Sequence, residues 1–188
     1  MELKGKVAVI TGGASGIGRA LCIQLAQEGV RAIGVVDMGD ATSQVCAEAN
    51  TQFGREVLIP FRGDVTDSTF RESVFCDLEK RFGMVGLCVP AAGITRDRLA
   101  VKIEANNGKS TAKIYDEADF RRVIDVDLIA PIYWALRMVA SVAVARARGN
   151  KPRWEPEESV QGAIVLIGSI SSAGNRGQIS YATAKAGL

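Results

Sequence analysis

Three residues near the end of the sequence have the types and spacing for proton transfer. Tyr181 and Lys185 are four positions apart, so a helix would place both side chains on one face. A nearby ammonium favours the phenolate form of a tyrosine, which can then exchange a proton with a substrate hydroxyl or carbonyl. Ser169 ends an expected strand shortly before them. The alternative is a partly buried tyrosine beside an exposed lysine, with no chemical role.

A glycine-rich segment, 11–18 (TGGASGIG), lies between an expected strand and an expected helix. We expect Gly12 to permit a tight turn, Gly16 to let backbone amides approach a pyrophosphate, and Gly18 to allow close helix packing. The helix N-terminus adds a positive dipole. This context predicts a dinucleotide-binding loop, and the alternative is a glycine-rich turn that binds nothing. The expected loop contacts are Gly12, Ser15, Gly16, Ile17 and Gly18.

Acidic residues refine the cofactor prediction. Asp37 ends the second expected strand, where a carboxylate accepts hydrogen bonds from an adenosine ribose 2′-hydroxyl and repels a 2′-phosphate. Ser15, where an arginine could have met a 2′-phosphate, also favours NAD over NADP. A turn-forming aspartate is the alternative for Asp37. Asp64 and Val65 follow the third strand and are expected at the adenine, whereas Asp67 is expected to cap a helix.

Composition excludes several classes of function. The sequence has no histidine, which removes Ser-His-Asp and Cys-His nucleophiles and HExxH zinc sites. The four cysteines have no metal-ligand spacing, so we expect no metal and four buried, reduced thiols in a cytoplasmic protein. A net charge of +2 is too balanced for a nucleic-acid or anionic-membrane surface. No apolar run has the length of a signal peptide or a membrane span.

Short apolar runs alternate with helical patterns, which predicts an α/β fold with a doubly wound parallel sheet, a Rossmann fold. Strands are expected over 6–11, 31–37, 56–61, 85–89 and 163–169. Pro60 indicates that the third strand is an edge, as the strand order 3-2-1-4-5 requires. Segments 104–115 and 149–161 are expected to be exposed insertions. A long helix over about 117–148 is expected to kink at Pro131.

With these residues assembled, the sequence resembles the short-chain dehydrogenase/reductase family over essentially its whole length. In that family a Thr-Gly-x-x-x-Gly-x-Gly loop binds the cofactor, an Asp-Val pair contacts adenine, and Ser, Tyr and Lys form the catalytic set. The matching positions are 11–18, Asp64, Val65, Ser169, Tyr181 and Lys185. The resemblance also implies cofactor contacts at Ala92, Gly93, Tyr181 and Lys185.

Segments 92–97 (AGITRD) and 174–178 (GNRGQ) look most like the 3-oxoacyl-carrier-protein reductases of the family. Those enzymes commonly use NADPH, and Asp37 argues against carrying that cofactor over to this chain. A 3-hydroxyacyl thioester, a steroid, a prostaglandin and a sugar-like alcohol all stay open as substrates, because resemblance implies a reaction class and not a substrate.

The sequence departs from the family pattern at three places. The family's Asn-Asn-Ala-Gly segment is 90–93 (PAAG), so we expect altered hydrogen bonding in the sheet. The family's catalytic asparagine falls on Asp127, which joins the catalytic set. If this position works through its backbone carbonyl, an aspartate can substitute; if its side chain faces the lysine, its charge opposes phenolate formation. The span from Ser169 to the tyrosine is one residue short, which makes Ser171 or Ser172 a rival.

These features together predict an NAD(H)-dependent oxidoreductase that interconverts a secondary alcohol and a ketone by hydride transfer, with Tyr181 as proton donor and acceptor. The alternative is a dinucleotide-binding or sensing module with impaired catalysis, favoured by Asp127 and Ala91. The partners expected are a small-molecule alcohol or ketone and, by resemblance, further copies of the chain in a homodimer or homotetramer. The apolar stretch 129–144 fits such an assembly.

The length of the chain carries a further expectation. We expect a single domain, 1–188, that is incomplete at its C-terminus. The helix that carries Tyr181 has barely begun at Leu188 and has no C-terminal cap.

Overall fold

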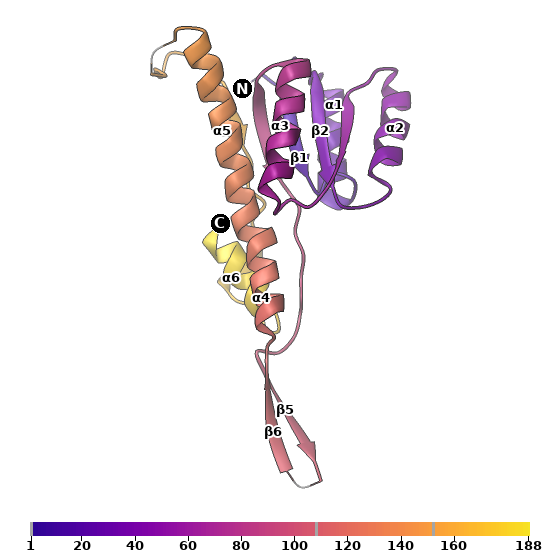
Figure 1. The fold of residues 1–188 in the computed structure, drawn as a ribbon, viewed down its shortest axis with the longest axis vertical. Coiled ribbons are helices and arrows are strands. Elements are labelled where there is room, and N and C mark those ends of the chain that lie inside the picture. Colours follow the sequence, from indigo (N-terminus) through magenta and orange to yellow (C-terminus); the bar gives the residue numbers. More distant parts are fainter. Residues whose placement is uncertain (1, 108, 152) are drawn as a thin grey trace. The chain divides into compact units, whose positions relative to one another are not determined.

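The computed structural model of the protein describes residues 2–107, 109–151 and 153–188, so residues 108 and 152 of the two expected insertions lie outside the described residues. The chain forms two compact units. One consists of Met1–Ala92 with Pro131–Ile167, and the other of Gly93–Ala130 with Gly168–Leu188. The first unit holds the parallel sheet, and the second holds a hairpin and short helices (Figure 1).

The first unit is built on a five-stranded parallel sheet with the order β3-β2-β1-β4-β7. The strands are β1 (Val7–Thr11), β2 (Ala32–Asp37), β3 (Leu58–Arg62), β4 (Val85–Pro90) and β7 (Ala163–Ile164). Counted within this sheet, the order is 3-2-1-4-5, which confirms the expected doubly wound topology. Pro60 lies in β3 at the edge of the sheet, as expected.

The last strand of the sheet is shorter than expected. β7 comprises only Ala163–Ile164, so the prediction of a strand over 163–169 is wrong beyond residue 164. The Val165 amide still donates to the Cys88 carbonyl at 3.0 Å, but Val165 and Leu166 are exposed. Within the described residues, β7 pairs only with β4, through Ala163 with Leu87 and Ile164 with Cys88, so it forms a short edge strand.

Helices cover both faces of this sheet. Buried side chains of α1 (Gly16–Gln27) and α2 (Thr42–Phe53) join those of the strands in one apolar cluster. On the other face, α3 (Ser68–Phe82) approaches β2 so closely that a Cβ on Gly34 would lie 2.7 Å from Leu78. α5 (Ala130–Arg148) packs on α3 through Trp134 and Phe75, whose ring centroids are 5.8 Å apart. The layers are therefore helix, sheet and helix.

The four cysteines differ in how deeply they are buried. Cys22, Cys46 and Cys88 are buried, and burial raises the pKa of the Cys22 and Cys88 thiols to about 12. Cys76 is exposed and is not among the buried residues of α3, which are Arg71, Val74, Phe75 and Leu78. The expectation of four buried thiols is therefore wrong for this residue.

The second unit contains the elements that follow β4 and β7. They are the hairpin strands β5 (Val101–Asn106) and β6 (Lys109–Ile114), α4 (Glu117–Ile124), a π-turn (Asp125–Ile129), a 3-10 turn (Ile170–Ala173) and α6 (Ile179–Gly187). The expected insertion at 104–115 is thus an antiparallel hairpin that begins at Val101, and the described side chains of β6 are all exposed. Pairing of Val101 with Ile114 and of Ile103 with Ala112 gives it one apolar face.

The long helix expected over 117–148 is divided. A π-turn separates α4 from α5, where the prediction placed a simple kink. Proline has no N–H, so Pro131 cannot donate the helical hydrogen bond to the carbonyl of Asp127, four residues earlier. The wider π-turn lies at that position.

By length and composition alone, the helical stretch Glu117–Arg148 also meets the criterion for a membrane span, with a mean hydropathy of 1.7 in its most apolar window. The expectation that no apolar run has the length of a membrane span does not hold for this stretch by that criterion. Core helices of soluble proteins meet the same criterion, so it assigns no membrane.

Candidate functional site

The glycine-rich turn between β1 and α1 has the geometry of a phosphate cradle. Gly12 adopts a φ of +66°, and a Cβ there would lie 2.9 Å from the backbone of Ala92. A Cβ on Gly18 would lie 2.2 Å from the Gly12 carbonyl oxygen. Gly16, with a φ of +51°, has open space beside it. Only glycine fits the first two positions, so the backbone of the turn is drawn close against its neighbours.

The first turn of α1 leaves its amides available. Ser15 is the N-cap in an extended conformation, and its side chain makes no capping hydrogen bond. Ile17 is 63% exposed and points away from the core. A helix N-terminus with uncapped amides favours an anion. These residues fit the pyrophosphate of a dinucleotide.

The Asp37 carboxylate lies at the carboxyl end of β2, beside this turn. Its Oδ2 accepts a hydrogen bond from the Ala14 amide at 3.1 Å, and its Oδ1 accepts from the Gly39 amide at 3.0 Å. The bond to Gly39 is the turn-forming contact of the alternative interpretation. The bond to Ala14 also ties the carboxylate to the glycine-rich turn, so both roles are compatible with the structure.

Asp64 and Val65 form a tight turn after β3. Asp64 Oδ1 accepts from the amide and the hydroxyl of Thr66 at 2.9 and 2.8 Å. Val65 is buried, and its carbonyl accepts a hydrogen bond from the Trp134 indole at 2.9 Å. Nothing in the sequence signalled Trp134, because its partner lies 69 residues away. Asp67 accepts from two amides at the start of α3, which confirms the expected helix cap.

At 90–93, where the sequence departs from the family's Asn-Asn-Ala-Gly segment, hydrogen bonds of the backbone amides join the strands. The amide of Ala91 donates to the Thr11 carbonyl at 3.2 Å, and the amide of Ala92 donates to the Thr11 hydroxyl at 3.1 Å. The ends of β1 and β4 are thus joined without side-chain amides. This joint fixes the backbone that faces Gly12.

In the second unit, α6 brings Tyr181 and Lys185 together as the spacing predicted. The Lys185 ammonium lies 5.6 Å from the centre of the Tyr181 ring. The side chain of Lys185 is only 5% exposed, so the alternative of an exposed lysine is wrong. Burial lowers the pKa of Lys185, while the charge of Asp127 acts in the opposite direction.

The π-turn presents Asp127 to the same lysine. Asp127 Oδ1 accepts a hydrogen bond from the Ile94 amide at 2.8 Å, and Oδ2 lies 3.8 Å from Lys185 Nζ. A Cβ on Gly93 would approach Oδ2 to 3.0 Å, so a glycine there leaves room for the carboxyl group. Burial raises the pKa of Asp127, and the Ile94 amide and Lys185 act against that rise. The sequence left open whether this position works through its backbone carbonyl or has a side chain that faces the lysine. The structure shows a side chain that faces the lysine.

Ser169 is the N-cap of the 3-10 turn that precedes α6, and Ser171 and Ser172 lie within that turn. Ser169 is half-buried and its hydroxyl accepts from the Ser171 amide at 3.1 Å. Ser171 is buried and donates to Gln178 at 2.9 Å, so its hydroxyl is used in holding the turn. Ser172 is exposed. Ser169 therefore remains the best of the three candidates for the catalytic serine, although its hydroxyl already accepts a hydrogen bond from the Ser171 amide.

Sequence reasoning missed the polar contacts that hold this turn and α6. Gln178 also donates to Asp97 at 2.9 Å, and the Arg98 amide donates to the Gly177 carbonyl at 2.8 Å. The Tyr115 hydroxyl donates to the Arg96 carbonyl at 2.7 Å. It also lies 2.9 Å from the hydroxyl of Ser180, the residue that precedes Tyr181 in the sequence. No local signal marks such pairs, because their members are 19 to 81 residues apart.

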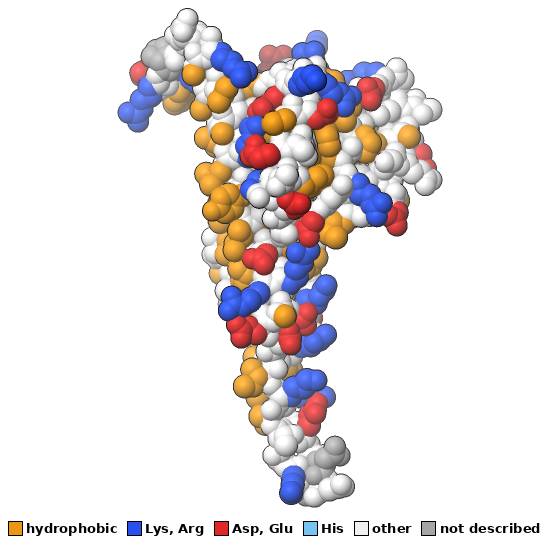
Figure 2. All heavy atoms as spheres, in the orientation of Figure 1, with side chains coloured by type: hydrophobic (Ala, Val, Ile, Leu, Met, Phe, Trp, Pro, Cys, Tyr) orange, Lys and Arg blue, Asp and Glu red, His pale blue; other side chains and the backbone are white. Residues whose placement is uncertain are grey.

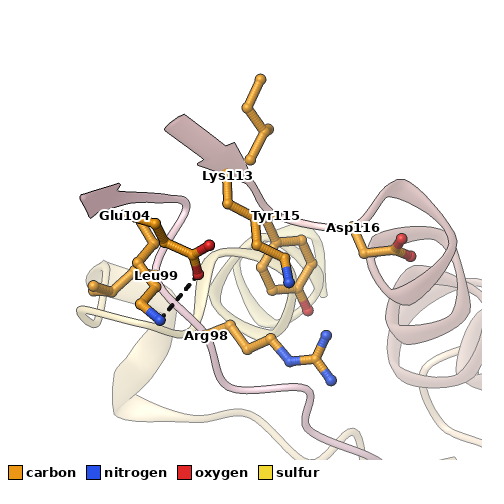
Figure 3. A pocket seen from close by; sticks show the side chains of 8 residues that line it. Arg98, Leu99, Glu104, Lys113, Tyr115 and Asp116 are labelled. Carbon is orange, nitrogen blue, oxygen red and sulfur yellow. Dashed lines mark hydrogen bonds and ion pairs between the residues drawn. The ribbon is translucent and has the colours of Figure 1, made fainter. Parts of the chain in front are cut away.

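A pocket of the second unit lies at the base of the hairpin and contains none of the predicted site residues (Figure 3). Its volume is about 630 Å³. Its lining residues are Arg98, Leu99, Lys102, Glu104, Lys113, Ile114, Tyr115 and Asp116. Lys102 pairs with Glu104 at 3.2 Å, and Arg98 pairs with Asp119 at 3.0 Å. Most of its charge is therefore already compensated. Within the described ranges, no three His, Cys, Asp or Glu side chains could hold a metal ion.

Comparison with known proteins adds a family match. The profile of the family described as short chain dehydrogenase matches residues 6–188. The chain is 33% identical over 193 residues to the 3-oxoacyl-[acyl-carrier-protein] reductases FabG of Escherichia coli (strain K12) and Pseudomonas aeruginosa. It is 31% identical over 189 residues to that of Thermotoga maritima. Each alignment covers 100% of this chain and 65% of the relative, so the chain spans about two thirds of their length.

A solved structure shares the fold. It is described as the crystal structure of NAD+-bound xylitol dehydrogenase, and it superposes with a TM-score of 0.73 at 23% sequence identity. The match covers 100% of this chain and 62% of that one. The likeness supports the doubly wound α/β fold.

Proposed function

The chain belongs to the short chain dehydrogenase family, and on that premise we propose that it is an oxidoreductase that interconverts a secondary alcohol and a ketone. The observation that carries the proposal is the buried Lys185 ammonium one helical turn from Tyr181 on α6. A buried cation beside a phenol stabilises the phenolate, which is the form that accepts a proton from an alcohol.

The roles proposed for the second unit follow from this pair. Tyr181 takes the hydroxyl proton when the alcohol is oxidised and returns it when the ketone is reduced. Ser169 donates a hydrogen bond to the substrate oxygen. Lys185 would hold the nicotinamide ribose and favours the phenolate of Tyr181. Asp127 stands at the position of the family's asparagine and acts on Lys185.

The cofactor proposed is NAD, with NADP the lesser candidate. Gly12, Ser15, Gly16, Ile17 and Gly18 would hold the pyrophosphate, and Asp64, Val65, Ala92 and Gly93 would contact the rest of the cofactor. Asp37 would bind the adenosine ribose, where its negative charge disfavours a 2′-phosphate. When bound, the nicotinamide supplies or accepts the hydride.

The experiment that tests this function is a screen of secondary alcohols and ketones with NAD and with NADP, following nicotinamide absorbance. Because the relatives named above are 3-oxoacyl-[acyl-carrier-protein] reductases, 3-hydroxyacyl thioesters belong in the screen. We expect turnover with NAD. The second candidate function is a dinucleotide-binding module without catalysis, favoured by the negative charge of Asp127 beside Lys185. Calorimetric binding of NAD without turnover of any alcohol would favour that module.

We also propose that the protein is a cytoplasmic homodimer or homotetramer that binds neither nucleic acid nor membrane, and that both units belong to one domain, 1–188. Figure 2 shows apolar side chains gathered along α5. Among them Tyr133, Leu136 and Val139 are 48–55% exposed. An apolar helix face of this kind is a typical subunit interface.

A further inference from the structure

Asp127 carries an unusual combination of burial and incomplete hydrogen bonding. It is 0% exposed, and within the described part of the chain its Oδ2 has no hydrogen-bond partner. Buried carboxylate oxygens are expensive to leave without a donor. The nearest compensating charge is Lys185 Nζ, 3.8 Å away, which is too far for a hydrogen bond. The contact is therefore electrostatic.

Among the residues that the structure describes, Lys185 is the charged group paired with this carboxyl group. Gly93 and Ile94 lie against it and carry no titratable side chain. α6 faces it with Lys185, which in turn lies 5.6 Å from the ring centre of Tyr181. In its own turn, Asp125 is exposed to solvent, and on α4 Arg121 pairs with Glu117. The three groups Asp127, Lys185 and Tyr181 thus form a series in which the lysine contacts both of the others.

We propose that Asp127 is a positioning residue that offsets the charge of Lys185 and so raises the pH at which Tyr181 can accept the substrate proton. The inference rests on the proposed function, because it assigns Tyr181 the proton transfer. An ammonium stabilises a nearby phenolate, and a carboxylate on its other side cancels part of that effect. Low exposure of both Asp127 and Lys185 keeps solvent from screening the carboxylate.

Asp127→Asn is the variant that isolates the charge. An asparagine keeps an oxygen that can accept from the Ile94 amide, and it removes the negative charge at nearly the same volume. We expect the phenolate of Tyr181 to form at a pH about one unit lower, so that alcohol oxidation on the rising limb of its pH profile increases about tenfold. Asp125→Asn, an exposed aspartate two positions earlier, is the matched control and should change neither quantity.

Two measurements test the proposal. The first is a spectrophotometric titration of phenolate absorbance without cofactor, in which Tyr181→Phe identifies the contribution of Tyr181. The second is the pH profile of kcat/KM for alcohol oxidation. If Asp127→Asn does not fold, as judged by thermal unfolding, Asp127→Ser removes the same charge and is titrated instead.

The outcomes separate this proposal from the function on which it rests. A Tyr181 titration that moves to lower pH supports the role of Asp127 even if no alcohol is turned over, in which case the proposed function fails. An unchanged titration in an enzyme that oxidises alcohols overturns the role of Asp127 alone. A shift to higher pH also overturns it, because Asp127 would then be keeping Lys185 charged rather than offsetting it.

Discussion

The Asp37 carboxylate has a structural role, and the proposed function gives it a second role in cofactor recognition. It accepts hydrogen bonds from the Ala14 and Gly39 amides and so fixes the turn after β2 against the glycine-rich turn. Its negative charge is held in place by backbone groups and not by a mobile side chain. Such a fixed charge discriminates between a ribose hydroxyl and a ribose phosphate.

We predict that Asp37→Asn reduces the preference for NAD over NADP about tenfold, since a neutral amide no longer repels the 2′-phosphate. The ratio of kcat/KM for the two cofactors measures the effect. Asp40→Asn is a suitable control, because Asp40 lies in the same turn but is exposed and paired with Arg62. An unchanged ratio in Asp37→Asn would rule out the assigned role of Asp37.

For single residues, the sequence predicts which side chains belong to the candidate site, but it does not predict which groups surround them. The contacts of Gly12 and Gly18 follow from a local motif of adjacent residues, and the structure shows close approaches at both. The Tyr181 and Lys185 pair follows from helical spacing. The surroundings of Asp127 were not predictable, because Ile94 and Lys185 come from parts of the chain 33 and 58 residues away and only folding brings them together.

Between elements, Arg137 is the main polar link from α5 to α3. Its guanidinium donates to both carboxylate oxygens of Glu79 at 2.9 and 3.1 Å and to Glu72 at 2.8 Å. It also lies over the Phe75 ring, 4.7 Å from its centre. Burial opposes the ionisation of Glu79, yet the hydrogen bonds from Arg137 hold the pKa of Glu79 below its ordinary value.

We predict that Arg137→Gln lowers the free energy of unfolding by about 2 kcal/mol at neutral pH, because it leaves the half-buried Glu79 carboxylate without its guanidinium donor. A carboxyl group whose pKa is lower in the folded than in the unfolded state stabilises the fold at pH values above its unfolded pKa. That stabilisation is lost as the pH falls through its folded pKa. The difference between wild type and variant should therefore shrink below about pH 4. Urea unfolding at several pH values measures it.

The control is Arg121→Gln, which breaks an exposed pair with Glu117 on one helix. Its cost should be within about 0.5 kcal/mol. Equal costs for the two variants, or a cost for Arg137→Gln that grows towards acid, would refute the role given to Arg137.

Elements with local signals were predictable, and those set by distant contacts were not. The capping aspartate Asp67 correctly marked the start of α3, since a cap needs only the next three residues. The π-turn at Asp125–Ile129 was missed, because Pro131 indicates a disturbance of the helix but not its form. The two-residue length of β7 was also missed, since strand length depends on a neighbour and not on the apolar run itself.

Taken as a whole, the protein exposes an apolar face along α5, which we propose as the surface of self-association. We predict that Leu136→Glu, at a residue that is 55% exposed, reduces the oligomer to a smaller species without lowering thermal stability, because the charge enters only the interface. Light scattering after size-exclusion chromatography gives the mass. Ile103→Glu, on the hairpin and 64% exposed, is the control and should leave the mass unchanged. An unaltered mass for Leu136→Glu would count against α5 as the interface.

The Tyr181→Phe variant tests the proposed proton transfer, because phenylalanine keeps the ring and removes only the hydroxyl that would transfer the proton. We predict that turnover of a secondary alcohol found in the screen falls by at least about a hundredfold, while calorimetric binding of NAD stays within about twofold of wild type. Full activity in Tyr181→Phe would contradict the proposed mechanism.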